Sequence, residues 1–185
     1  MIIWLNGTYG VGKTTVARKI EELLDTETEI LESDYYYQEM VKENMLLAFG
    51  GTLPQNNKNF LMRFKKVIEE KLENTNKQII IVMALTQKEG VELLFEHFNS
   101  KGNVLHIILT ASEETIKSRI NSDDNREKGF AIEWLKYNLA FLDANFPDAI
   151  RIDTENEDAD AIAKKIINYL NCNDFKIRYA IGDGL

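Results

Sequence analysis

Several features that would assign a protein to a particular class are missing from this sequence. Its 185 residues include a single cysteine, Cys172, so no intramolecular disulfide can form. No apolar run is long enough to cross a bilayer, and the N-terminal one, Met1 to Leu5, ends at Asn6. These absences predict a cytoplasmic protein with a free thiol, and they argue against membrane association.

An excess of positive charge is also missing. The chain has 22 Lys and Arg against 30 Asp and Glu, a formal net charge of -8. Because nucleic-acid backbones are bound by clustered basic residues, this balance argues against nonspecific nucleic-acid binding. The two histidines, His97 and His106, have no carboxylate or thiol partners at metal-ligand spacing, which argues against a zinc site.

What the sequence does contain is a phosphate-binding pattern near its N-terminus. Residues 7–14 read Gly-Thr-Tyr-Gly-Val-Gly-Lys-Thr and fit G-x-x-x-x-G-K-[ST], behind the apolar run 2–5 and ahead of an amphipathic stretch. Its glycines let successive backbone N–H groups converge on a phosphate. Lys13 is expected to reach the β- and γ-phosphates, and the Thr14 hydroxyl to bind Mg²⁺. The predicted ATP contacts of this loop are Gly7, Tyr9, Gly10, Val11, Gly12, Lys13, Thr14 and Thr15.

A glycine-rich turn that binds nothing is the other interpretation of this pattern. The strand expected before the loop and the helix expected after it favour a nucleoside triphosphate site, because the mechanism needs the loop between those two elements.

The periodicity of the whole chain predicts an α/β fold. About five strands are expected, at residues 2–5, 29–31, 78–85, 104–109 and 149–152. Amphipathic stretches between and after them predict helices at 16–24, 35–47, 60–74, 89–99, 112–120, 131–142 and 159–170. Right-handed crossovers then imply one parallel sheet with helices on both faces, hence three layers.

No boundary divides the chain, so 1–185 is predicted to be a single domain. Within it we expect an acceptor-side helical region at 33–75 and a polar, lid-like loop at 121–130. A C-terminal extension of weak structure is expected at 171–185.

Two acidic residues follow the second predicted strand. In an open α/β sheet the ligand crevice lies outside the carboxyl ends of the strands, so Glu32 and Asp34 are expected to face the phosphate site. Asp34 is the candidate to orient or deprotonate an acceptor hydroxyl, and Glu32 the candidate to hold Mg²⁺ through water. A solvated acidic turn is the other interpretation of this pair.

Two arginines flank the polar stretch after the fourth predicted strand. Arg119 and Arg126 could stack on adenine or bind a phosphate at two points, which suits a closing segment. Surface salt bridges, for example to Glu114 or Asp123, are the alternative role for both arginines.

Two missing motifs narrow the class of nucleotide-binding protein. The third strand ends in residues 82–86, Val-Met-Ala-Leu-Thr, without the aspartate that a motor ATPase uses to hold Mg²⁺. An N-K-x-D sequence, which specifies guanine in GTPase switches, is not found after the fourth strand. Both absences leave small-molecule phosphoryl transfer as the best interpretation.

Residues 1–17, Met-Ile-Ile-Trp-Leu-Asn-Gly-Thr-Tyr-Gly-Val-Gly-Lys-Thr-Thr-Val-Ala, resemble the start of the bacterial tunicamycin-resistance ATP-binding proteins. The likeness continues at 79–86 and 108–115. The order of elements is similar to that of P-loop small-molecule kinases such as shikimate, nucleotide and chloramphenicol kinases. This resemblance implies a P-loop NTPase fold with the strand order 2-3-1-4-5.

The resemblance also implies roles for individual residues. Asp34 corresponds to the acid that meets the acceptor, and Arg119 to an arginine beside the adenine. The turn 153–156 would border the base, which implies contacts from Thr154, Glu155 and Asn156. The predicted catalytic residues are Lys13, Asp34, Arg119 and Arg126, and the predicted metal ligands are Thr14 and Glu32.

Together these observations predict Mg²⁺-dependent phosphoryl transfer from ATP to a small hydroxylated acceptor, with an antibiotic as one possible partner. The alternative is an ATP-dependent protein that binds or sequesters its ligand without transferring phosphate. The sequence leaves the identity of the acceptor and the oligomeric state open.

Overall fold

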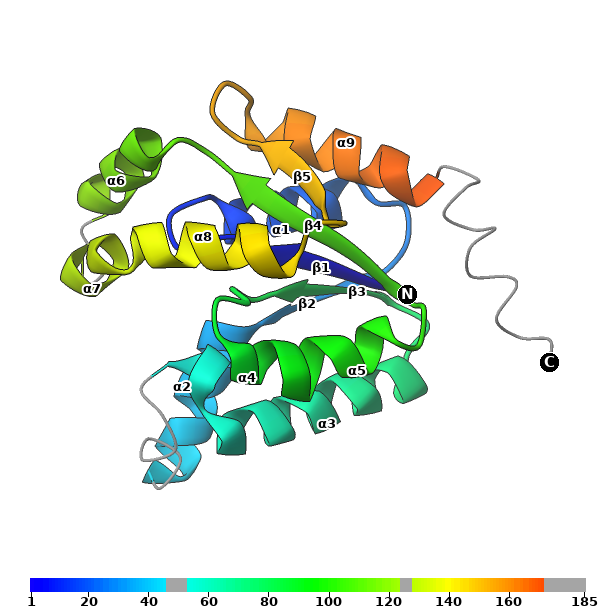
Figure 1. The fold of residues 1–185 in the computed structure, drawn as a ribbon. Coiled ribbons are helices and arrows are strands. Elements are labelled where there is room, and N and C mark those ends of the chain that lie inside the picture. Colours follow the sequence, from blue (N-terminus) through cyan, green and yellow to red (C-terminus); the bar gives the residue numbers. More distant parts are fainter. Residues whose placement is uncertain (46–52, 124–127, 172–185) are drawn as a thin grey trace.

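The computed structural model describes residues 1–45, 53–123 and 128–171. Five strands form one parallel sheet in the order β2-β3-β1-β4-β5 (Figure 1). The strands are β1 (Ile2–Asn6), β2 (Thr28–Glu32), β3 (Gln78–Val82), β4 (Val104–Thr110) and β5 (Ile150–Asp153). The predicted three-layer α/β fold and its strand order are confirmed.

The central strand β1 is buried along its whole length because its side chains pack into the core on both faces of the sheet. Side chains alternate across a strand, so Ile3 and Leu5 pack into one cluster while Ile2 and Trp4 pack into the other. Helices α1 (Lys13–Leu23) and α9 (Ala159–Asn171) supply the first cluster. The second is supplied by α3 (Lys58–Asn74), by α8 (Leu135–Asn145) and by the helix that spans residues 88–99.

The helix at 88–99 contains a change of helical pitch. It comprises α4 (Lys88–Gly90), the π-helical turn η3 (Val91–Phe95) and α5 (Glu96–Asn99). The remaining helical elements are α2 (Ser33–Glu43), the 3₁₀ turn η2 (Pro54–Asn56), α6 (Glu113–Ser122) and α7 (Lys128–Glu133). Among the residues that the structure describes, no helix has the length and apolar character needed to span a bilayer.

Several predicted boundaries differ from those observed. The third strand ends at Val82 rather than at residue 85, and the helix expected at 35–47 begins at Ser33. The lid-like loop expected at 121–130 begins with the last residues of α6 and ends with the first residues of α7. Residues 124–127, which include Arg126, lie outside the described residues, as does the C-terminal extension beyond Asn171.

A buried carboxamide joins the two halves of the sheet at the end of β1. Asn6 is fully buried, and its Oδ1 accepts hydrogen bonds from the backbone N–H of Gly7 (2.7 Å) and of Leu85 (2.9 Å). These two bonds identify Nδ2 as the donor toward His106 Nε2 on β4, 3.1 Å away. His106 Nε2 must therefore be unprotonated, because an imidazole nitrogen that accepts a hydrogen bond carries no proton.

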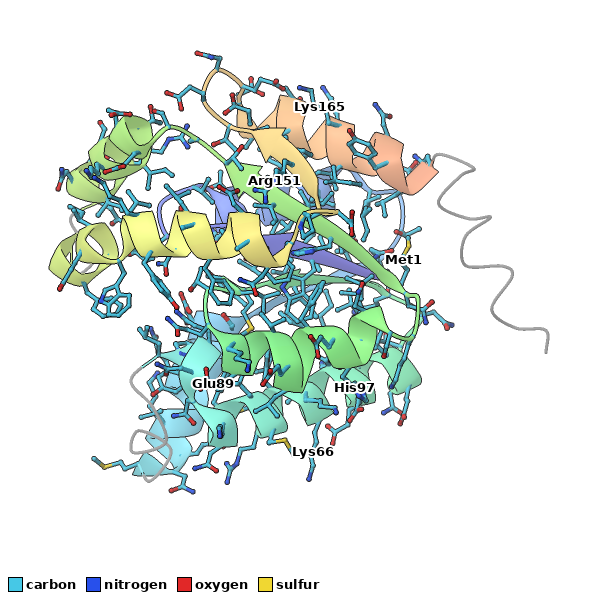
Figure 2. The ribbon with its side chains drawn as sticks, viewed as in Figure 1. Met1, Lys66, Glu89, His97, Arg151 and Lys165 are labelled. Atoms are coloured by element: carbon cyan, nitrogen blue, oxygen red, sulfur yellow. The ribbon has the colours of Figure 1, made fainter. Side chains whose placement is uncertain are left out.

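The surroundings of His106 favour this neutral form. Its ring lies between Phe95 and Phe146, with ring centroids 4.5 and 4.8 Å away. Burial, together with the positive charge of Arg151 on β5, lowers the pKa of His106 from 6.5 to about 3. The second histidine differs, since His97 Nε2 lies 2.8 Å from Glu69 Oε1, a partner 28 positions away that sequence spacing did not indicate. Figure 2 labels Arg151 and His97, which lie on different layers of the molecule.

We predict that His106 makes the fold sensitive to mild acid. Because the pKa is about 3 in the folded chain and near 6.5 in the unfolded chain, the unfolded chain binds the proton first. The free energy of unfolding should fall by up to about 1.4 kcal/mol per pH unit below 6.5. Urea unfolding at pH 7, 6 and 5 should show this slope in the native chain and lose it in His106→Gln. His97→Gln is the control and should retain most of the slope; an equal slope in His106→Gln would contradict the assignment.

Candidate phosphate and acceptor site

The glycine loop between β1 and α1 has the backbone conformation that convergent N–H groups require. Gly7, Gly10 and Gly12 have φ values of 135°, 79° and 98°, a region that favours glycine. A Cβ atom on Gly7 would lie 2.7 Å from the carbonyl oxygen of Leu109. At this position glycine is therefore needed both for backbone conformation and for close packing against β4.

The last two residues of the glycine pattern, Lys13 and Thr14, already have hydrogen-bond partners. Lys13 Nζ donates to the carbonyl oxygens of Gly7 (3.0 Å) and Thr8 (2.8 Å), which places its ammonium group against the loop. Thr14 Oγ1 donates to Glu32 Oε1 at 2.7 Å. The structure thus brings together the two residues predicted as metal ligands, one from the first turn of α1 and one from the end of β2.

Asp34, the predicted acceptor-side acid, lies in the first turn of α2 and is exposed to solvent. The hydrogen bond that the structure gives it comes from Ser33 Oγ, 3.5 Å away, so its carboxylate is open to a ligand. Glu32 and Asp34 both lie at the carboxyl edge of the sheet, as predicted. They differ in setting, because Glu32 is the last residue of β2 and is held by Thr14, whereas Asp34 belongs to a helix.

The predicted adenine side is built around Thr154, just after β5. Arg119 on α6 donates from Nη1 to Thr154 Oγ1 (2.9 Å) and from Nη2 to the Thr154 carbonyl oxygen (2.7 Å). The Thr154 hydroxyl also lies 3.0 Å from the Thr110 carbonyl oxygen and 3.4 Å from that of Val11 in the glycine loop. Thr154 therefore holds Arg119 beside the glycine loop.

Glu155 holds the start of α6. Its carboxylate accepts hydrogen bonds from the Ser112 N–H (2.8 Å), the Ser112 hydroxyl (3.0 Å) and the Thr115 hydroxyl. These bonds, that from Thr115 foremost, lower the pKa of Glu155. The structure therefore gives Glu155 a role in positioning the helix that carries Arg119. The next residue, Asn156, is exposed.

The remaining predicted loop residues differ in their surroundings. Val11 is buried in the core beside α1, whereas Tyr9 packs against the small cluster of Ile116, Ile120 and Leu135. Thr15 is exposed at the start of α1.

Three polar residues near the loop were not among the predicted site residues. Asn6 is one, and its signal in the sequence is a polar residue that closes an otherwise apolar strand. The others are Thr8 and Thr86, whose buried hydroxyls have no hydrogen-bond partner among the described residues. Thr86 lies just beyond Leu85, and nothing in its local sequence distinguishes it from an ordinary loop threonine.

A parallel sheet in the order 2-3-1-4-5, with a glycine loop between its central strand and the following helix, defines a P-loop fold of the small-molecule kinase type. The sequence profile of the AAA domain family matches residues 3–133. Because the match covers more than half of the chain, the protein belongs to the AAA domain family. No protein of curated function matches the sequence.

Solved structures with this fold include a resistance protein and two small-molecule kinases. The tunicamycin resistance protein of Deinococcus radiodurans superposes with a TM-score of 0.73 at 20% identity, over 91% of this chain and 94% of that one. Shikimate kinase from Acinetobacter baumannii gives 0.65 at 24% identity, over 93% of each chain. A gluconokinase from Sinorhizobium meliloti 1021 gives 0.61 at 14% identity, over 91% and 90%. At these identities the similarity shows the fold.

We predict that the loop glycines differ in what they contribute to stability. Gly7→Ala introduces a Cβ that collides with the Leu109 carbonyl, so it should cost about 2–4 kcal/mol from strain and crowding. Gly12→Ala has an unfavourable φ but nothing within 4 Å of the new Cβ, so it should cost about 1–2 kcal/mol. Urea denaturation measures both, with Gly129→Ala in α7 as a control that should not destabilise. Equal losses for Gly7→Ala and Gly12→Ala would show that contact with β4 is unimportant.

Proposed function

We propose that this protein binds ATP with Mg²⁺ and transfers the γ-phosphoryl group to a hydroxyl of a small molecule. The observation that carries the proposal is the hydrogen bond from Thr14 to Glu32, beside the Lys13 ammonium on the loop. β3 ends without an acid, but Glu32 pairs in register with Val82 on the neighbouring strand. An acid on β2 therefore stands at the level where a motor ATPase carries one on β3.

The residues at this point suit Mg²⁺. The Thr14 hydroxyl and the Glu32 carboxylate are oxygen donors, which Mg²⁺ prefers. The described residues contain no group of three or more His, Cys, Asp or Glu side chains that could hold a metal alone. This too suits Mg²⁺, which is usually bound by one or two protein groups with phosphate oxygens and water. When bound, it would offset charge on the β- and γ-phosphates.

The chain's own groups account for the remaining requirements of the reaction. Lys13 would exchange two carbonyl contacts for phosphate oxygens, aided by the free N–H groups at the start of α1. The acceptor oxygen forms a bond to the γ-phosphorus as the bond to the bridging oxygen breaks, and ADP leaves. Asp34, open to solvent at the same edge, accepts the proton of the hydroxyl. Arg119 would flank the base; Arg126 remains a sequence prediction.

A nucleotide-dependent binding protein is the second candidate. It is favoured by the exposure of Asp34, which is not joined by a hydrogen bond to the described loop residues. The structural similarity to a tunicamycin resistance protein suggests tunicamycin as one ligand to test under either proposal.

Lys13→Ala should weaken ATP binding by about 10- to 100-fold or more, because charge-assisted hydrogen bonds to phosphate contribute about 1.5–3 kcal/mol each. Calorimetric titration with ATP in the presence of Mg²⁺ measures the change. Lys19→Ala is the matched control on α1, since Lys19 is paired with Glu22 on the exposed face. Unchanged ATP affinity in Lys13→Ala would show that the triphosphate is bound elsewhere.

Asp34→Asn should lower phosphoryl transfer by about 10²- to 10⁴-fold while leaving ATP affinity unchanged, because a general base acts in the transition state. ADP release is followed with hydroxylated candidates that include sugars, nucleosides and tunicamycin, and products are identified by mass spectrometry. Undiminished turnover in Asp34→Asn removes Asp34 from the mechanism. Tight ligand binding in ATP without any phosphorylated product would establish the binding-only alternative.

A further inference from the structure

A small cavity lies on the acceptor side of the molecule, where three segments that are distant in sequence meet. Its volume is about 160 Å³. The segments are η2, the residue that precedes α4, and the α7–α8 junction. The lining residues are Leu53, Gln55, Asn56, Gln87, Phe130, Trp134 and Asn138. A second hollow, of about 420 Å³, lies between β5 and α9 and contains charged pairs such as Lys165 with Glu157.

The lining of the smaller cavity combines carboxamides with apolar side chains and carries no ionisable side chain among the described residues. The carboxamides of Gln55, Gln87 and Asn138 form no hydrogen bond within the described chain, so their donors and acceptors are available to a ligand. Each carboxamide offers both a donor and an acceptor edge. A ligand here would meet hydrogen-bonding groups of both kinds without meeting a charge.

Two aromatic rings complete the cavity. Phe130 and Trp134 have ring centroids 5.9 Å apart and planes tilted by 34°. Their side chains remain 42% and 38% exposed, although large aromatic rings are normally buried. Exposed aromatic rings beside free carboxamides are typical of surfaces that stack on a ring and hydrogen-bond its edge.

The segment after β3 connects the cavity to Asn6, the residue that precedes the glycine loop. Leu85 N–H is bound to Asn6, which leads directly into Gly7, and Gln87 is two residues further along. A chain advances at most about 3.6 Å per residue, so the Cα of Gln87 lies within about 7 Å of that of Leu85. Between them lies Thr86, whose buried hydroxyl has no partner in the described structure.

We infer that this cavity binds an uncharged six-membered ring of the acceptor, from a sugar or a nucleobase, stacked on Trp134 and hydrogen-bonded at its edge by Gln87 and Asn138. This inference rests on the proposed function. A cavity of about 150 Å³ can hold one benzene ring, so the volume here suits a single ring. A ring carboxylate would lose hydration without gaining a cation from the described lining, which disfavours acidic acceptors.

The test measures ring binding separately from phosphoryl transfer. Uridine and methyl α-D-glucopyranoside serve as neutral probes, and shikimate as a hydroxylated ring acid, each titrated by ligand-observed NMR. At least one neutral probe should bind more tightly than shikimate. Comparison of uridine with the glucopyranoside then distinguishes a nucleobase from a sugar as the bound ring. Failure of both neutral probes to bind, or tighter binding of shikimate, would overturn the inference.

Variants then locate the bound ring. Gln87→Ala and Asn138→Ala should each weaken the neutral probe about 3- to 10-fold, the usual value of one hydrogen bond. Trp134→Ala should abolish detectable binding, whereas Trp134→Phe should keep most of it because an aromatic face remains. Gln38→Ala, on the exposed side of α2, is the matched carboxamide control. Undiminished binding in the cavity variants, with the fold intact by circular dichroism, would contradict the site.

The same probes in Lys13→Ala separate this inference from the proposed function. Ring binding should persist in that variant, because the cavity does not include Lys13. Ring binding without phosphoryl transfer to any candidate would count against the kinase proposal alone. Suppose instead that the phosphoryl group is transferred to a compound and that its KM is unchanged by the substitutions at Gln87, Trp134 and Asn138. That result would count against the cavity alone.

Discussion

The arrangement of the site depends on one buried carboxamide at the end of the central strand. Asn6 accepts hydrogen bonds from Gly7 and Leu85 and donates one to His106, so a single side chain connects the glycine loop to β4 and to the segment that follows β3. Leaving either buried N–H without an acceptor would cost about 1–3 kcal/mol. The bond to β4 further requires a neutral imidazole, which the apolar surroundings of His106 provide. The position of the loop is thus determined by its packing partners as well as by its glycines.

Two further groups of side chains adjoin the segments that Asn6 holds. On one side Thr154 connects the end of β5 to the loop and to Arg119, and Glu155 holds the helix that carries this arginine. On the other side the segment after Leu85 leads to the small cavity with its aromatic and carboxamide lining. Thr14 and Glu32 are joined by a hydrogen bond at the same edge of the sheet. One edge of a parallel sheet can therefore position a phosphoryl donor and an acceptor, because all the strands end there.

Much of the fold and the position of the glycine loop could be predicted, because the signals were local or belonged to a motif. Apolar periodicity located the strands, and the glycine pattern placed Lys13 and Thr14. Resemblance to P-loop kinases supplied the strand order, and it placed Arg119 and the turn at Thr154 separately beside the base without predicting the hydrogen bonds between them. What escaped prediction depends on contacts between distant segments. The partnership of Glu155 with Ser112 spans 43 positions, and the cavity combines residues from 53 to 138. No local pattern carries such information, and the lid-like loop was placed too widely because its polar composition also suits exposed helix ends.

A crystal structure with a nonhydrolysable ATP analogue and Mg²⁺ would show whether the glycine loop is a triphosphate site completed by Glu32. We expect Lys13 Nζ to leave the carbonyl oxygens of Gly7 and Thr8 for phosphate oxygens, with Mg²⁺ bound by Thr14 and approached by Glu32 through water. The contacts of Asn6 should be unchanged. A structure in which the analogue binds elsewhere, or in which Lys13 and the Thr14–Glu32 bond keep their present partners with nucleotide in the loop, would contradict this assignment of the triphosphate site.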